Sequence, residues 1–127
     1  MKPEGYPVRR HGQPVKRYCQ TLDLKEDPEL IARYRACHSA ARMWPEILAG
    51  IREVGILEME IYLLGSRLCM IVETPLDFGW EEAMARLATL PRQAEWEDFV
   101  ARFQACRPGA ASGEKWQLME RMSHLYD

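Results

Sequence analysis

The sequence lacks the features that mark several common classes of protein. No apolar run approaches the ~18 residues of a membrane span, and residues 1–10 have no apolar core of a secretory signal. The net charge of −2 gives no sign of the basic face of a nucleic-acid-binding domain. There is also no glycine-rich loop or P-loop lysine to bind a phosphate group. We therefore expect a cytoplasmic protein that binds neither nucleic acid nor a membrane.

Cysteines are few and dispersed, at positions 19, 37, 69 and 106. None forms a C-x-x-C pair, so a zinc knuckle or a thioredoxin motif is unsupported and no metal site is expected. Cys19 and Cys69 fall in strand-like runs, where a free thiol acts as a small apolar residue. Buried free thiols in a reducing compartment are the interpretation that we favour.

What the sequence does contain is enough apolar residues for one compact domain. Its 127 residues are 47% hydrophobic and 28% charged, which is ordinary for a globular protein. Residues 1–14 hold three prolines and two glycines without an apolar period, and we expect them to form a flexible arm. Residues 15–127 form the predicted single domain.

Strand patterns and helix patterns follow one another in a recognisable order. Alternating or β-branched runs predict strands at 16–24, 57–64, 67–73 and 114–125, with Gly65-Ser66 as a hairpin turn. Apolar residues at helical spacing predict helices at 28–43, 45–54, 77–90 and 91–105, and 106–113 reads as a loop. The order is the split βαβ pattern of ferredoxin-like folds. It predicts an α+β domain, a four-stranded antiparallel sheet with helices on one face.

Residues typical of helix ends support two of these helices. Asp27 is a good N-cap, and Pro28 suits the first helical position because its missing N–H would have no intrahelical partner. Gly55 should end the second helix in the left-handed cap position.

The sheet face away from the helices would carry Cys69, Ile71 and Tyr62, and it needs a cover. A second copy of the chain is the obvious one, so we expect a homodimer packed sheet to sheet.

The candidate chemistry lies in residues 34–46, Y-R-A-C-H-S-A-A-R-M-W-P-E. His38 is the one histidine expected inside a folded element, and a pKa near neutrality would let it give and take a proton. Tyr34 lies one helical turn before it and shares its face. Both also have a structural interpretation, because a lone histidine and a core tyrosine are common in ordinary folds.

Three tryptophans could form the walls of a binding site. Trp44, Trp80 and Trp96 offer flat faces that stack against the C–H side of a sugar ring. Trp96, in register with Phe99 and Phe103, is equally typical of a core helix. The set favours a small neutral polar ligand and proton-transfer chemistry.

These residues resemble the L-rhamnose mutarotase family of sugar mutarotases, and especially its L-fucose mutarotase-like branch. The resemblance covers residues 16–125, and its segments are R-Y-C-Q-T-L-D-L-K-E-D-P-E-L-I at 17–31, Y-x-x-x-H at 34–38, W-P-E-I at 44–47, G-I-L-E-M-E-I-Y-L-L-G-S-R-L-C-M-I-V-E at 55–73, Q-A-E-W-E at 93–97 and G-E-K-W at 113–116. It implies a ferredoxin-like dimeric α/β barrel. It also implies that His38 is the proton-donating histidine, Tyr34 a substrate-contacting tyrosine, and Trp96 the second of two tryptophans that line the sugar site.

The chain departs from the family pattern in three places. Glu95 stands where the first tryptophan of that pair is expected, and Met59 stands where a substrate-binding tyrosine is expected. The spacing from His38 to Trp44 is two residues longer than in the family. Two residues turn a helix by about 200°, so we expect an insert looped out near 39–43 and an altered placement of Trp44.

The resemblance implies a mutarotase that interconverts the α and β anomers of a 6-deoxy-hexose. L-fucose is favoured over L-rhamnose because L-D-L-K, E-M-E-I-Y and G-E-K-W look like that branch. His38 would deliver a proton to the ring oxygen with Tyr34 in its hydrogen-bond network, and a water or Glu95 would take the proton of the anomeric hydroxyl. No cofactor is implied. Two alternatives stay open: a cofactor-free monooxygenase on the same scaffold, and a non-catalytic small-molecule-binding protein.

Overall fold

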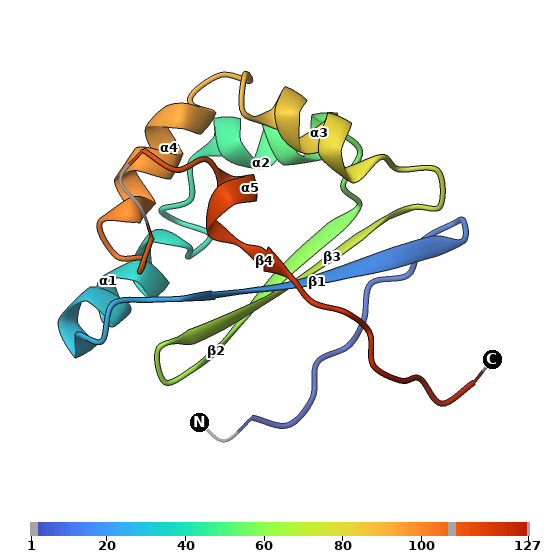
Figure 1. Ribbon diagram of the computed structural model, residues 1–127, viewed down its shortest axis with the longest axis horizontal. Helices are drawn as coiled ribbons and strands as arrows, with labels where there is room; N and C mark the ends of the chain where they lie inside the picture. Colours follow the sequence, from blue (N-terminus) through green and yellow to red (C-terminus); the bar gives the residue numbers. More distant parts are fainter. Residues whose placement is uncertain (1–2, 107–108, 127) are drawn as a thin grey trace.

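A four-stranded antiparallel sheet carries the helices on one of its faces (Figure 1). The computed structural model describes residues 3–106 and 109–126, and within them the strand order is β2-β3-β1-β4. The strands are β1 Val15–Asp23, β2 Glu58–Leu64, β3 Arg67–Pro75 and β4 Gln117–Leu118. The predicted α+β class, its ferredoxin-like topology and the one-sided helices are confirmed.

The helices lie between these strands in the predicted order. They are α1 Pro28–Cys37, α2 Pro45–Glu53, α3 Trp80–Leu87, α4 Gln93–Ala101 and α5 Ser112–Lys115. α3 and α4 are shorter at both ends than the predicted ranges 77–90 and 91–105. Between them, residues 88–92 form a turn in which Arg92 adopts a positive φ of 65°. Gly55, with a φ of 103°, follows the end of α2 as predicted.

The core lies between the sheet and the helices. Even-numbered residues of β1 and β3 face the helices and pair across the two strands, as Leu22 does with Leu68 and Gln20 with Met70. Ile47 of α2 and Val100 of α4 cover them and are almost fully buried. The hairpin turn predicted at residues 65 and 66 joins β2 to β3, with Gly65 at a φ of 61°. The period-2 pattern therefore positions the sheet correctly.

The first helix begins where the sequence predicts but ends earlier. The Asp27 carboxylate accepts hydrogen bonds from the backbone N–H groups of Glu29 at 2.9 Å and Leu30 at 3.3 Å. The prediction that the helix continues to residue 43 is wrong, because α1 ends at Cys37 and residues 39–43 form turns. The imidazole of His38 forms a hydrogen bond with the carbonyl of Tyr34. In a continuing helix, the backbone N–H of His38 would donate to that same carbonyl. That N–H donates instead to the carbonyl of Arg35, so the side chain competes with the helical ladder and ends it.

The C-terminal segment also differs from the prediction. The strand expected over 114–125 is wrong: residues 112–115 form α5, and β4 pairs with β1 only at Gln20–Leu118 and Thr21–Gln117. The tail that follows has no alternating pattern, and Met122 is 91% exposed. The loop predicted over 106–113 gives way to α5 at residue 112, and its residues 107 and 108 lie outside the described residues.

The second face of the sheet is partly covered by the N-terminal segment, which crosses below it as an extended chain (Figure 1). The Nε2 atom of His11 lies 2.9 Å from Oε1 of Glu73, and the rings of Tyr6 and Tyr62 meet edge to face at 5.8 Å. The Arg17 guanidinium and then His11 hold the pKa of the Glu73 carboxyl below its usual range. The division into an arm and a domain stays a prediction.

The cysteines are free, as the sequence indicates, but only partly buried. Cys19 and Cys69 lie on the open face with their Sγ atoms 3.3 Å apart. The open face therefore carries apolar and sulfur-bearing side chains that are only partly buried.

Candidate functional site

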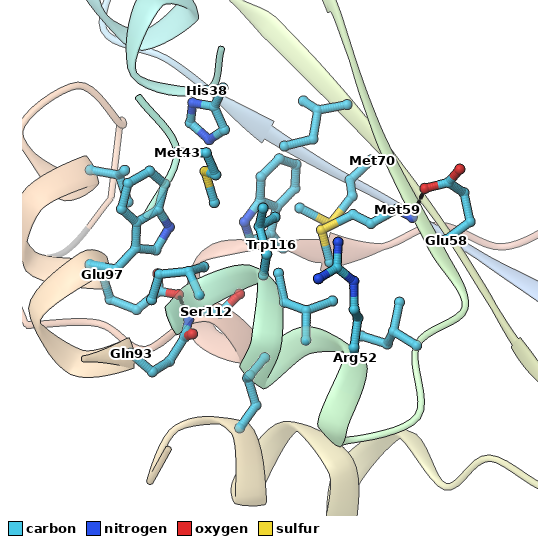
Figure 2. Close-up of a pocket in the computed structure, with 18 of the residues that line it drawn as sticks. His38, Met43, Arg52, Glu58, Met59, Met70, Gln93, Glu97, Ser112 and Trp116 are labelled. Carbon is cyan, nitrogen blue, oxygen red and sulfur yellow. Dashed lines mark hydrogen bonds between the residues drawn. The ribbon is translucent and has the colours of Figure 1, made fainter. Parts of the chain in front are cut away.

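A cavity of about 380 Å³ lies between the helices and the sheet, on the side where α1, α2 and α4 meet β2 and β3 (Figure 2). Its volume falls in the range of small-molecule pockets. Among the described residues, its lining consists of Tyr34, His38, Met43, Ile47, Leu48, Ile51, Arg52, Ile56, Leu57, Glu58, Met59, Ile61, Met70, Leu87, Gln93, Trp96, Glu97, Val100, Gln104, Ser112 and Trp116. Most of the wall is apolar, with a few polar groups set into it.

His38 enters this cavity from the end of α1. Its Nδ1 atom lies 2.8 Å from the carbonyl oxygen of Tyr34. A carbonyl can only accept, so Nδ1 carries the proton and the neutral ring keeps an unprotonated Nε2. Burial lowers the pKa of His38, and the bond to the Tyr34 carbonyl opposes that shift without cancelling it. The resting side chain is therefore a neutral base.

Tyr34 packs directly against this histidine. The two rings are 4.3 Å apart, and Tyr34 is 4% exposed. Burial raises the pKa of its phenol, which therefore keeps its proton. The hydroxyl oxygen accepts a hydrogen bond of 3.4 Å from Nε2 of Gln104. Tyr34 thus lines the cavity as a protonated phenol.

The tryptophans divide between the site and its support. Trp96 is a buried residue of α4 that lines the cavity and meets His38 edge to face at 5.3 Å. Trp44 lies behind it, with ring centroids 5.1 Å apart, and the Arg92 guanidinium covers its outer face at 4.1 Å. Trp80 packs on Tyr18 at 4.4 Å. Only Trp96 of the three is among the residues that line the cavity.

The two residues that depart from the family pattern lie in different places. Met59 lines the cavity from β2 with its thioether. Glu95 lies on the outer side of α4, where its carboxylate is 61% exposed and bonds to the Arg92 guanidinium at 3.0 Å. That guanidinium lowers the pKa of Glu95. The structure therefore brings together His38, Tyr34, Trp96 and Met59, and leaves Glu95 and Trp44 outside the lining.

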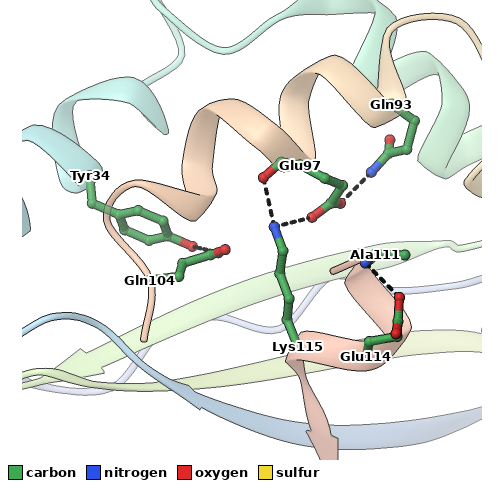
Figure 3. A network of polar contacts seen from close by, with 7 residues as sticks. All are labelled: Tyr34, Gln93, Glu97, Gln104, Ala111, Glu114 and Lys115. Atoms are coloured by element: carbon green, nitrogen blue, oxygen red, sulfur yellow. Dashed lines mark hydrogen bonds and ion pairs between the residues drawn. The ribbon is translucent and has the colours of Figure 1, made fainter. Parts of the chain in front are cut away.

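A polar network that the sequence patterns did not reveal forms one wall of the cavity (Figure 3). Nζ of Lys115 donates to Oε1 of Glu97 at 2.9 Å and to its backbone carbonyl at 2.7 Å. Nε2 of Gln93 donates to Oε2 of the same carboxylate at 2.6 Å. The i, i+4 spacing of Gln93 and Glu97 on the helix that carries Trp96 is the signal that could have identified them.

Gln104 is fixed by backbone pairing rather than by its own helix. It forms an isolated β-bridge with Leu24. On either side of it, the backbone carbonyl of Phe103 accepts a hydrogen bond from the N–H of Lys25, and the N–H of Ala105 donates to the carbonyl of Asp23. Its Oε1 atom has no hydrogen-bond partner among the described residues. Because Gln104 lines the cavity, its amide can take part in binding a polar ligand there.

No group of three or more His, Cys, Asp or Glu side chains in residues 3–106 and 109–126 is placed to hold a metal ion. No helix in the same residues is long and apolar enough to cross a bilayer.

A family model and a curated relative both identify sugar mutarotases as similar to this chain. A family model described as L-rhamnose mutarotase matches residues 17–125. An L-fucose mutarotase of Xanthomonas campestris pv. campestris is 41% identical over 111 residues, which cover 87% of this chain and 89% of that protein. A UPF0734 protein of Dictyostelium discoideum is 34% identical over 114 residues, covering 87% and 90%.

Solved structures show the same fold. An L-rhamnose mutarotase from Formosa agariphila superposes with a TM-score of 0.65 at 18% identity, covering 87% of this chain and 99% of that one. Tetracenomycin F2 cyclase from Streptomyces glaucescens, a type-II polyketide cyclase, superposes with a TM-score of 0.56 at 15% identity, covering 88% and 98%. At these identities the likeness concerns the fold alone.

Proposed function

The chain belongs to the L-rhamnose mutarotase family, and from that premise we propose how its pocket acts and on which sugar. It is a sugar mutarotase, an isomerase that interconverts α and β anomers. Our proposal is a 6-deoxy-hexose substrate, with L-fucose preferred over L-rhamnose. The 41% identity to the Xanthomonas L-fucose mutarotase over most of both chains supports that preference.

The observation that carries the mechanism is the 2.8 Å distance from Nδ1 of His38 to the carbonyl oxygen of Tyr34. Because a carbonyl oxygen can only accept, Nδ1 donates its proton to it and the free lone pair is on Nε2. A neutral imidazole of this kind takes a proton before it delivers one. The proton delivery expected from the sequence therefore becomes the second half of a transfer.

In the proposed ring opening, Nε2 of His38 takes the proton of the anomeric hydroxyl. The C1–O1 bond becomes a carbonyl as the bond from C1 to the ring oxygen breaks. The imidazolium then delivers the same proton to the departing ring oxygen, which gives the open aldehyde and restores neutral His38. Rotation about C1–C2 and the reverse steps close the ring on the other face. Both oxygens are attached to C1, so one nitrogen can serve them in turn.

Tyr34 and Trp96 hold the sugar during this exchange. The phenol of Tyr34 stays protonated and offers a hydrogen bond to an oxygen that is gaining negative charge. The indole of Trp96 offers an apolar face for the sugar ring. No step in the scheme draws on a cofactor.

Anomer exchange measured by NMR tests this proposal. The exchange rate between the α and β anomeric protons is recorded for L-fucose and L-rhamnose, with and without protein. We expect faster exchange for L-fucose and a smaller effect for L-rhamnose. Equal acceleration of both sugars would contradict the preference, and sugar binding without acceleration would identify a non-catalytic binding protein instead.

The structural comparison adds little support to the other alternative, a cofactor-free monooxygenase. The likeness to a polyketide cyclase at 15% identity concerns the fold. A cavity of about 380 Å³ with Glu97, Gln93 and Gln104 in its wall suits a small polar ligand better than a large aromatic one.

We also propose that the chain forms a homodimer through the open face of the sheet. Cys19, Cys69 and Ile71 lie half-buried on that face, and Met119 beside Cys19 is 52% exposed. Sedimentation equilibrium would give the mass directly, and a monomer at micromolar concentration would contradict the proposal. A cytoplasmic location stays a prediction.

A further inference from the structure

The buried ion pair of Lys115 and Glu97 has no part in the ring-opening scheme. The side chain of Lys115 is 0% exposed, and that of Glu97 is 12% exposed. Taking two charges out of water is costly, and a well-packed apolar pair often fills the same space with no loss of stability. The pair therefore calls for a use in the cavity beyond stabilising the fold.

Among the partners found in residues 3–106 and 109–126, none fills every accepting position on the two oxygens of the Glu97 carboxylate. A carboxylate has about four positions for hydrogen bonds. Lys115 takes one on Oε1, and Gln93 takes one on Oε2. The other accepting positions are on a carboxylate that lines the cavity and is held in place by Lys115 and Gln93 (Figure 3). We propose that Glu97 binds two neighbouring hydroxyl groups of the sugar and so orients it, a role that rests on the proposed mutarotase function.

Chemistry favours a vicinal diol as the group that Glu97 binds. Each hydroxyl of the diol donates to one oxygen, and both bonds are strengthened because the acceptor is charged. Because Lys115 and Gln93 already fix the carboxylate, little freedom is lost when the sugar binds. Trp96 of the same helix also lines the cavity and supplies a ring face for the sugar.

Orientation follows from where the groups lie. Figure 2 shows His38 at one end of the pocket, with Glu97, Gln93 and Ser112 gathered away from it. In a pyranose, the hydroxyls at C3 and C4 lie across the ring from C1 and the ring oxygen. Binding that diol at Glu97 therefore turns C1 toward His38. Glu97 would determine specificity without touching the proton that moves.

Two double variants isolate this role, E97Q/K115M and E97M/K115M. Each removes both charges, because removing only one would leave a buried unpaired charge and destabilise the fold. The first keeps an amide oxygen that can accept from a sugar hydroxyl and from Gln93, and the second keeps neither. A difference between the two therefore reports the acceptor and not the lost ion pair.

The assay is anomer exchange by NMR for L-fucose and its 3-deoxy and 4-deoxy analogues. We expect E97M/K115M to lose roughly 10- to 100-fold in kcat/KM, mostly through KM, and E97Q/K115M to lose less. Wild type should discriminate against both analogues, and E97M/K115M should treat them like the parent sugar. A merely structural role would leave that discrimination unchanged.

Several outcomes would overturn the inference. If the two folded variants share one KM and one pattern with the analogues, Glu97 binds no hydroxyl. If neither variant folds, wild type alone decides, because equal turnover of the parent sugar and both deoxy analogues excludes a bound diol. If wild type accelerates no aldose, the proposed function itself fails, and that result is distinct from both others.

Discussion

The pH dependence of turnover follows from the state of His38. Its pKa is lowered by burial from an ordinary value of about 6.5. The neutral base is therefore the main form at neutral pH, and it remains so as the pH falls through 6.5. We expect kcat to be flat from pH 8 to 6.5 and to decline only below that, as the imidazole takes up a solvent proton.

The variant His38→Asn gives this prediction its magnitude. The asparagine amide can keep a bond to the Tyr34 carbonyl, but it has no group in the place of Nε2. Loss of one acid–base group costs ~10²–10⁴-fold in rate, or about 2.7–5.4 kcal/mol at 1.36 kcal/mol for each tenfold. The acid limb should disappear with it, leaving a flat profile near the uncatalysed rate.

The measurement is anomer exchange at saturating L-fucose between pH 4.5 and 8. Because buffers catalyse mutarotation themselves, each rate is extrapolated to zero buffer concentration. A kcat that rises as the pH falls through 6.5 would mean that the histidine starts as an imidazolium, and the proposed order of proton transfer would be wrong. Full activity in a folded His38→Asn protein would remove His38 from the mechanism altogether.

The lowered pKa of His38 also predicts a pH effect on folding, and four substitutions test other parts of the structure. As the pH falls, the unfolded chain takes up a proton at His38 at a higher pH than the folded chain does, so the free energy of unfolding should be greatest above pH 6.5 and should decrease below it. Urea titrations at several pH values measure this decrease, with His38→Asn as the control. Tyr34→Phe leaves the Gln104 amide unpaired and should cost about 1–3 kcal/mol in the free energy of unfolding, which urea denaturation measures. Gly55→Ala forces a side chain to a φ of 103° and should cost about 1–2 kcal/mol, whereas Gly113→Ala, with open space around it, should change the melting temperature little. Glu95→Gln should leave kcat and KM unchanged in the exchange assay, because that carboxylate lies on the outer surface.

Much of the fold could be predicted because its signals are local. The alternation in β2 and the Asp27-Pro28 start of α1 each depend on a few neighbouring residues. The early end of α1 could not be predicted in this way. It depends on a side chain that competes with the backbone for one carbonyl, and helix propensity does not describe that competition.

In the site, too, some residues could be predicted from local spacing and others could not. Tyr34 and His38 share a helix face, so their meeting follows from spacing. Lys115 and Glu97 are 18 positions apart, and each looks like an ordinary surface charge in sequence. Only the chain reversal that brings α5 against α4 reveals them as a buried pair. The same reversal leaves β4 two residues long, where pattern alone suggested a full strand.

The capture of the Tyr34 carbonyl by His38 constrains how this protein could evolve. One side chain both supplies the reactive nitrogen and terminates α1, so position 38 cannot drift through ordinary helix-forming residues without altering both. A leucine or glutamine there would favour continuation of the helix through residues 39–43, which would change the shape of the cavity at Met43. A lineage that lost the histidine would therefore lose the shape of the site as well as its chemistry. Regaining activity would then require two coordinated changes instead of one reversion.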